Sequence, residues 1–194
     1  MTAMRASPRS TATAWPDGFE VLDACHRETL AQLDELGTLS ARIQEGAPDA
    51  ALRAAAARIV AFFSTTARQH HEDEERHVLP QMATSDDAAI AQAALRLQQD
   101  HDWLEEDWME LSPHLDAIAC GQSWYDVDLL REGVQVFIEL SRDHIALEES
   151  CIYPEARSRL VEHQRLEMDR EMAARRAHRA AASRAPRRPP AARP

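Results

Sequence analysis

The chain has 194 residues, a length that suits one domain with tails and is sufficient to bury a core. It contains only 5 glycines and 5% aromatic residues, while alanine, leucine, glutamate and arginine are abundant, which favours helices over a sheet of β-branched residues. The formal net charge is −11, and this acidic balance argues against a nucleic-acid interface on the main body, because phosphate contacts need a cationic surface.

The charge is distributed unevenly along the chain. Residues 169–194 carry eight arginines and two acids, a net +6, whereas residues 1–168 carry 14 arginines and 31 acids, a net −17. An acidic body suits a protein that supplies carboxylates to metal ions. The arginine-rich end leaves two interpretations open, a contact with an acidic partner or nucleic acid, or a disordered end without a partner. We favour the second and do not expect a nucleic-acid partner.

The three cysteines, Cys25, Cys120 and Cys151, are odd in number and widely spaced, which indicates reduced thiols rather than a disulfide framework. No run of 18 apolar residues occurs, and residues 1–16 lack a hydrophobic signal core. We therefore expect a cytoplasmic location without a membrane partner.

The first helix is predicted over residues 18–45, after a disordered leader over residues 1–16. Asp17 is the expected N-terminal cap, and Gly46 and Pro48 end the helix. Its apolar positions recur at spacings of three and four, with one histidine among them. These positions are Phe19, Leu22, His26, Leu30, Leu33 and Leu36.

The second helix is predicted over residues 48–79, with Pro48 in its first turn and Pro80 disrupting or ending it. Its face consists of Leu52, Ala56, Ile59, Phe63, Thr66, His70 and Glu74. Residues 84–87 form a turn and cap for the third helix, whose face consists of Ile90, Ala94, Leu97, His101, Leu104 and Trp108. Ser112-Pro113 is expected to break or kink this helix, with a short continuation to Gly121.

The fourth helix is predicted to begin behind Asp126 and to be closed by Pro154. Its face consists of Leu130, Val134, Phe137, Leu140 or Ser141, His144 and Glu148. We expect an all-α antiparallel up-down four-helix bundle over residues 17–160, because long amphipathic helices with short connections pack in this way. A helical extension follows over residues 161–182, and residues 183–194 form a disordered Arg/Pro-rich tail.

One sequence pattern occurs twice, near the ends of the second and fourth helices. His70, Glu74, Glu75 and Pro80 stand at offsets 0, 4, 5 and 10, and His144, Glu148, Glu149 and Pro154 stand at the same offsets. A histidine and a glutamate four residues apart lie on one helix face, about 6 Å apart along the axis. Both pairs continue an apolar face, so they point into the bundle, where unpaired carboxylates cost several kcal/mol. The pattern therefore predicts two halves of one metal site.

The other two helices each place one histidine on the apolar face, His26 and His101. Each alone is better explained as a core histidine, but with the repeated pattern the total is four histidines and two glutamates. This number suits two metal ions bridged by the glutamates, since one tetrahedral zinc needs only four ligands. Imidazole with carboxylate suits iron, and it also admits manganese or zinc.

The register of the second helix has an alternative, because His71 and Glu75 have the same spacing as His70 and Glu74. Position 145 is isoleucine, so the second copy selects His70–Glu74 as the ligand pair. We place His71 and Glu75 in the surroundings of the site or at the surface. Asp73 is interpreted as part of a solvated face, and His77 and Cys151 as packing residues.

These motifs together resemble the hemerythrin-like HHE cation-binding family, whose pattern is His, His-x3-Glu, His and His-x3-Glu on four helices. The matching residues are His26, His70 with Glu74, His101, and His144 with Glu148. The resemblance implies a non-haem di-iron centre that binds dioxygen, nitric oxide or peroxide, or that serves iron homeostasis.

Two positions differ from the oxygen-carrying hemerythrins. Those proteins have a histidine where this chain has Glu105, and they use His-x4-Asp where this chain has His144-x3-Glu148 followed by Glu149. Both differences weigh against simple reversible oxygen carriage, because a lost histidine opens a coordination position. Glu105 as a seventh ligand is a hypothesis.

We carry three functions forward from the sequence. The first is a module that binds or senses dioxygen or a related small molecule. The second is an enzyme that turns over peroxide, dioxygen or nitric oxide with the same centre, and the third is an iron storage or donor protein.

Overall fold

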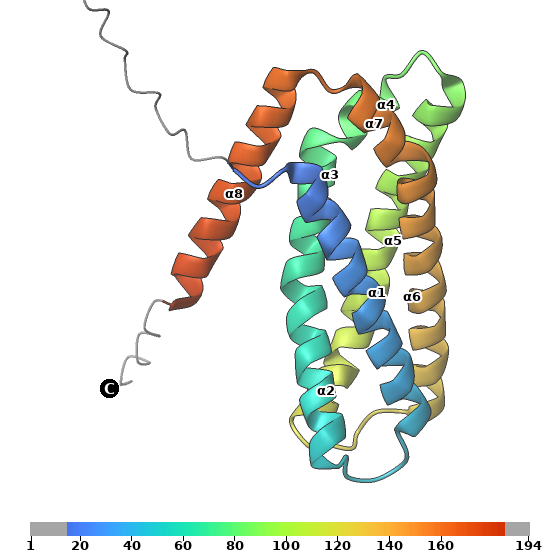
Figure 1. Ribbon diagram of the computed structural model, residues 1–194. Helices are drawn as coiled ribbons and strands as arrows, with labels where there is room; N and C mark the ends of the chain where they lie inside the picture. Colours follow the sequence, from blue (N-terminus) through green and yellow to red (C-terminus); the bar gives the residue numbers. More distant parts are fainter. Residues whose placement is uncertain (1–14, 185–194) are drawn as a thin grey trace, which may run out of the picture.

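The structure, a computed structural model, describes residues 15–184, and within this range it is helical almost throughout and contains no strand (Figure 1). Most of the predicted leader (1–16) and of the Arg/Pro-rich tail (183–194) lies outside the described residues. In the described part of the chain, every helix is either too short or too polar to cross a membrane.

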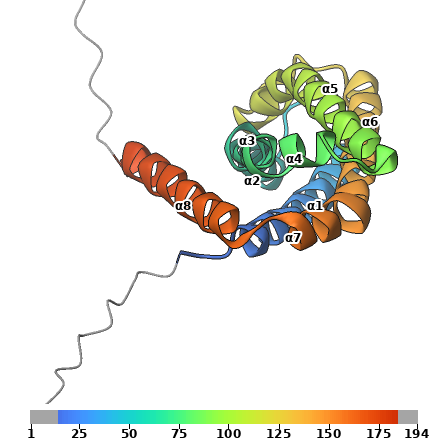
Figure 2. The same cartoon turned by 90° about the horizontal axis from the view of Figure 1, so that it is seen from above.

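Four long helical segments lie side by side, and successive segments run in opposite directions (Figures 1 and 2). The first is α1 (Gly18–Arg42), and the second joins α2 (Ala50–Ala61), the π-helical η1 (Phe62–Ala67) and α3 (Arg68–His77). The third is α5 (Ala88–Ala119), and the fourth joins α6 (Val127–Leu147), the π-helical η2 (Glu148–Ile152) and α7 (Tyr153–Arg159). The short α4 (Leu79–Ala83) precedes α5, and α8 (Glu162–Arg184) follows α7. Each long segment packs on two others, α1 on α2 and α6, and α5 on the same two.

Aspartate side chains cap the starts of the long segments, as expected from the unpaired N–H groups of a first helical turn. The caps predicted at Asp17 and Asp126 are present, since their carboxylates accept hydrogen bonds from backbone N–H groups of the first turn. The second segment begins at Ala50 behind Asp49, so the predicted start at Pro48 is wrong by two residues. The first helix ends at Arg42, three residues before the predicted end, because Ile43 is already extended.

Pro113 and Pro154 do not break or close a helical segment as predicted, whereas the helix is interrupted near Pro80 as predicted. α5 continues through Pro113 to Ala119, and Pro113 is exposed, so the backbone carbonyl that loses its partner lies on the solvent side. Pro154 does not close the fourth segment, because it lies in the first turn of α7, where a missing N–H costs nothing. Pro80 occupies the same kind of position in α4, after an interruption of the helix at Val78.

Two apolar clusters fill the interior, one on each side of a polar layer. The lower cluster in Figure 1 includes Ile59, Phe63, Trp108, Leu115 and Phe137, and the upper cluster includes Phe19, Leu79, Leu97, Ile152 and Met168. Along the third segment, for example, Leu97 belongs to the upper cluster, Leu104 to the lower cluster, and His101 lies between them. The polar residues of the site thus form a layer between two hydrophobic cores.

The C-terminal helix α8 contacts α1 and α3 and contributes Met168 to the upper cluster. Much of α8 projects to one side of the other helices (Figure 2). The Gly18 backbone N–H donates to Asp169 Oδ1 at 2.6 Å. A Cβ at position 18 would lie 2.7 Å from Met168 Cε, so the absence of a side chain at Gly18 allows the two helices to approach.

Candidate metal centre

The structure brings all six predicted site residues together in the polar layer. α1 supplies one of them, α3 two, α5 one, α6 one, and the first position of η2 the last. They are His26, His70, Glu74, His101, His144 and Glu148, and none of their side chains exposes more than 4% of its surface. This burial follows from the helical register, since each residue continues the apolar face of its own segment.

The six residues form two overlapping groups of four. One group contains His26, His70, Glu74 and Glu148, and the other contains Glu74, His101, His144 and Glu148. In each group, one potential ligand atom per residue lies within 4.8 Å of every other. Glu74 and Glu148 belong to both groups, so two carboxylates stand between two positions that each have a pair of imidazoles.

The contacts show that the donor set suits metal ions. Glu148 Oε2 lies 3.0 Å from His26 Nε2, and Glu148 Oε1 lies 3.0 Å from His144 Nε2. Glu74 Oε2 lies 3.3 Å from His70 Nε2 and 3.6 Å from His101 Nε2. Within residues 15–184, these three carboxylate oxygens have no hydrogen-bond partner of good geometry, nor do His101 Nε2 and His144 Nε2. Buried carboxylates without donors are costly, and multivalent cations between them would remove the cost.

The two glutamates have opposite pKa shifts. Burial, together with the charge of Glu148, raises the pKa of Glu74 to about 7. Burial also disfavours the ionised form of Glu148, but the neighbouring His144 and His26 outweigh it and hold the pKa of Glu148 well below its usual value. The pair therefore carries one firmly ionised carboxylate and one that shares protons near neutral pH.

Three histidines of the site bind protons more tightly than usual when no metal is present. Burial alone would lower the pKa of His144, but the carboxylates of Glu148 and Asp100 raise it to about 10. The pKa values of His26 and His101 are raised for the same reason, since carboxylates outweigh the effect of burial. His70 is the exception, because burial and the neighbouring His26 hold its pKa well below the usual value.

The second glutamate of each Glu-Glu pair holds a histidine from another helix. Glu149 Oε1 lies 3.1 Å from His26 Nδ1, and Glu75 Oε1 lies 3.0 Å from His101 Nδ1. These hydrogen bonds direct the Nε2 atoms of both histidines toward the shared glutamates, as the outer partners of metal-binding histidines commonly do. The sequence placed Glu75 near the site or at the surface, and the structure gives it this specific contact.

Sequence reasoning missed Tyr153 as a site residue. Its O–H donates to Glu74 Oε1, its oxygen lies 3.2 Å from His26 Nε2, and its ring stacks on the His26 ring at 5.1 Å. Burial, with the charges of Glu74 and Glu148, raises the pKa of the phenol well above its usual value. The repeated pattern carried no signal for this residue, because the equivalent position in the first copy is Leu79.

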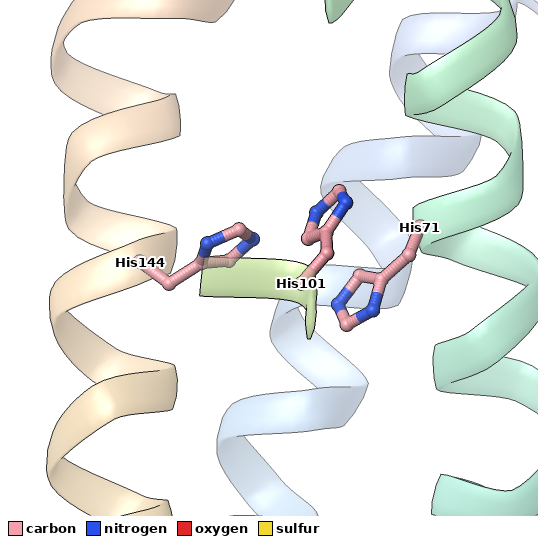
Figure 3. Close-up of side chains that lie close together, drawn as sticks. All are labelled: His71, His101 and His144. Carbon is pink, nitrogen blue, oxygen red and sulfur yellow. The ribbon is translucent and has the colours of Figure 1, made fainter. Parts of the chain in front are cut away.

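His71 lies in the surroundings of the site, one of the two placements that the sequence left open. Its ring stacks on the His101 ring with a centroid distance of 4.1 Å and lies 5.6 Å from the His144 ring. Figure 3 shows these three histidines approaching one another from α3, α5 and α6. Glu105, the hypothetical seventh ligand, belongs to neither group of four, and it pairs instead with Arg68 at 3.1 Å.

The interpretation of Asp73 as part of a solvated face is wrong. Asp73 is fully buried and forms ion pairs with Arg175 and with Arg176, the latter at 2.8 Å, both from α8. The helix that the sequence marked only as an extension supplies these partners, which short-range spacing could not reveal. His77 also faces α8, with Glu171 at 3.5 Å, and Cys151 is half-buried.

A cavity of about 40 Å³ borders the site from the side of the lower cluster. Its apolar lining includes Phe63, Leu104, Trp108 and Phe137, and its polar lining includes histidines of both groups of four. One water needs roughly 10–15 Å³ of such space, so the cavity has room for molecules of only a few heavy atoms.

Comparison with known proteins gives one finding. The family model described as the hemerythrin HHE cation binding domain matches residues 17–156, which include all six predicted site residues and exclude α8. The search of curated proteins gives no match for this chain.

Proposed function

Because the chain belongs to the hemerythrin HHE cation-binding family and its buried histidines and glutamates can hold metal ions, we propose a specific form of this function. The protein is an antiparallel up-down four-helix bundle that holds two non-haem iron ions bridged by carboxylates. It binds or senses dioxygen or a related small molecule such as nitric oxide or peroxide in the cytoplasm.

One observation carries this proposal, the sharing of Glu74 and Glu148 by two groups of four ligand residues. His26 and His70 would hold one ion, and His101 and His144 the other. A single closed zinc site would use four ligands and leave two buried histidines without a role. The mixture of imidazole and carboxylate ligands suits iron, although manganese and zinc accept the same ligands.

A bound iron pair would supply electrons and open coordination positions to a small molecule. The residues of the chain define which molecules can reach it. Phe63, Trp108 and Phe137 line the cavity beside the site with apolar surface, and the cavity volume of about 40 Å³ excludes organic substrates of ordinary size. Glu75 and Glu149 fix the orientation of His101 and His26, so the donor set is held in place from outside.

Metal analysis with an absorption spectrum tests the proposal. Protein produced in iron-containing medium is expected to hold about two irons per chain and to show near-ultraviolet bands of a ferric pair that fade on reduction. Glu148→Ala should lose most of the metal, since Glu148 contributes to both groups, whereas exposed His163→Ala serves as the matched control. A colourless protein with a single zinc would overturn the proposal.

A second candidate function is an enzyme that turns over peroxide, dioxygen or nitric oxide. Tyr153 favours it, because a buried phenol that keeps its proton lies beside Glu74 and His26 and can donate a hydrogen bond at the site. Repeated turnover by the wild-type protein and its loss in Tyr153→Phe would support the enzyme. Dioxygen that is bound and then released unchanged under vacuum would support the binding function, and ready loss of iron to metal-free acceptor proteins would support storage or donation.

The arginine-rich end suits an acidic partner only in part. Arg175, Arg176 and Arg179 already pair with Asp73 and Glu72 within the chain. A partner would therefore engage residues 185–194, which carry three further arginines. If a chain without these ten residues keeps all its partners and its location in the cell, the proposal of an acidic partner fails.

A further inference from the structure

His71 stands at the edge of the two groups of four without a role in either. Its ring nitrogens make no hydrogen bond and no ion pair within the described residues, although the side chain is half-buried. Because the side chain is only half-buried, water can reach it, and the absence of a protein partner leaves its nitrogens available to a ligand or ion.

The neighbours of His71 are two other imidazoles. One nitrogen from each of His71, His101 and His144 lies within 4.8 Å of the other two, and these side chains come from three different segments (Figure 3). Imidazoles that carry protons repel one another at such distances. A cation between the nitrogens would turn this unfavourable contact into a favourable one.

We propose that His71 is a seventh protein ligand and completes a face of three imidazoles, with His101 and His144, on one of the two metal ions. This inference rests on the proposed di-metal function. That ion would then be held by His71 together with His101 and His144, the two histidines that also stand with the shared glutamates. The ion held by His26 and His70 would have two histidines and the same glutamates. The two positions would therefore differ in the number of ligands that remain available to a small molecule.

The assignment explains how the chain tolerates glutamate at position 105. Glu105 pairs with Arg68 at 3.1 Å, exposes 37% of its side chain, and lies outside both groups of four. His71 reaches the same ion from α3 instead, so a third imidazole is present although α5 supplies only one. The histidine replaced by Glu105 weighed against reversible binding of a small molecule. With His71 as a ligand, that ion is closed by protein ligands, and this argument no longer holds.

The test measures metal content and metal affinity rather than activity. Wild-type protein, His71→Ala, Glu105→Ala and His163→Ala are loaded anaerobically with ferrous iron, and bound iron is then titrated against a chelator. His71→Ala is expected to lose one ion or to bind it at least 10- to 100-fold more weakly, the loss typical of disturbing even the outer partners of a metal site. Added imidazole should restore part of this affinity. Glu105→Ala and His163→Ala should bind iron as the wild-type protein does.

The outcomes separate this inference from the proposed function. Two irons in the wild-type protein and two equally tight irons in His71→Ala would overturn the role of His71 and leave the di-iron proposal standing. Wild-type protein without a metal pair would overturn both. Circular dichroism of the metal-free variants shows whether they fold, and His71→Gln, which keeps the bulk of the side chain, replaces His71→Ala if the latter does not. If Glu105→Ala loses iron while both His71 variants retain it, the seventh ligand is Glu105 and the inference is overturned.

Discussion

Two consecutive glutamates occur at each half of the site, and the members of each pair have different contacts. Glu74 and Glu148 face the histidines across the polar layer, whereas Glu75 and Glu149 each hold the Nδ1 atom of a histidine on another segment. A helix turns by about 100° per residue, so adjacent residues cannot face the same direction. In each pair, one carboxylate therefore faces the interior of the polar layer, and the other orients an imidazole on another segment.

Glu75→Ala tests this division at the residue scale. The variant should bind iron about 10- to 100-fold more weakly, because His101 loses the carboxylate that fixes its ring and its tautomer. Chelator titration of the loaded protein measures the change, and Glu106→Ala, which alters an exposed acid on α5, is the matched control. Unchanged affinity in Glu75→Ala would mean that the hydrogen bond to His101 has no influence on the site.

The sequence predicted which six residues the structure brings together, and what it left out has a common cause. The second copy of the pattern selected His70 and Glu74 in preference to His71 and Glu75. In the structure Glu74 belongs to both groups of four and His70 to one of them. The same comparison removed His71 from consideration, because Ile145 occupies the equivalent position. A repeat identifies what two halves share, whereas His71 and Tyr153 occur in one half only and depend on contacts across the bundle.

At the scale of elements, the π-helical segment η1 lies directly before α3 and its site residues. Phe62, Phe63 and Ala67 are buried in this segment, while Thr66, predicted on the inner face, is exposed. A π-helical turn contains about one residue more than an α-helical turn, so η1 shifts the face of the helix without ending it. Spacing along the sequence could not reveal this shift, because an uninterrupted α-helix fits the apolar residues nearly as well.

Deletion of Thr66 should convert η1 into ordinary α-helix and preserve the register on both sides. We expect two irons per variant chain as in the wild type, and a change in stability within about 1 kcal/mol, because the lost side chain is exposed. Deletion of Gln99 in α5 is the control, since α5 has no π-helical turn to absorb the change. It should rotate Leu97 out of the upper cluster and cost about 2–5 kcal/mol. If the two deletions lower the free energy of unfolding in urea equally, this account of η1 is refuted.

The contact between α8 and α3 gives a further prediction. The double variant Arg175→Ala/Arg176→Ala leaves the fully buried Asp73 without either cationic partner. Loss of stability by about 3 kcal/mol is expected in urea unfolding, since an uncompensated buried charge is costly. Arg179→Ala removes an exposed pair with Glu72 and should cost less than about 1 kcal/mol. A double variant as stable as Arg179→Ala would show that the ion pairs of Asp73 with α8 contribute little to stability.

At the scale of the whole molecule, the order of the helical segments was more predictable than the effect of single prolines and the packing of α8. Four amphipathic segments, their order and most of their aspartate caps followed from spacing and composition, because burial of an apolar face governs both. The positions of Pro113 and Pro154 inside continuous segments did not follow, since solvent contact and first-turn placement decide whether a proline interrupts a helix. The docking of α8 depends on Gly18 and Asp73, residues more than 100 positions from their partners.

Binding of metal ions is expected to release protons from the protein into solution. The metal-free protein holds a proton on His144 at neutral pH, because its pKa is raised to about 10, and a fraction of one on Glu74, whose pKa is about 7. Ligands must be deprotonated to bind metal, so at least one proton per chain should appear at pH 7. The release from His144 should disappear as the pH rises through about 10. An indicator dye in weakly buffered solution measures it during iron addition, and iron uptake without acidification would contradict the assignment of His144.

The distribution of the ligands over the chain also determines when a metal ion can first bind during synthesis. Both groups of four contain Glu148, and the three-histidine face contains His144, so no group of ligands is complete until the fourth segment exists. A nascent chain on the ribosome can present His26 and His70 long before that point, but each such fragment offers only part of a site. The ligand set is therefore completed only when the fourth segment packs, and incomplete chains are expected to have little capacity to retain metal ions.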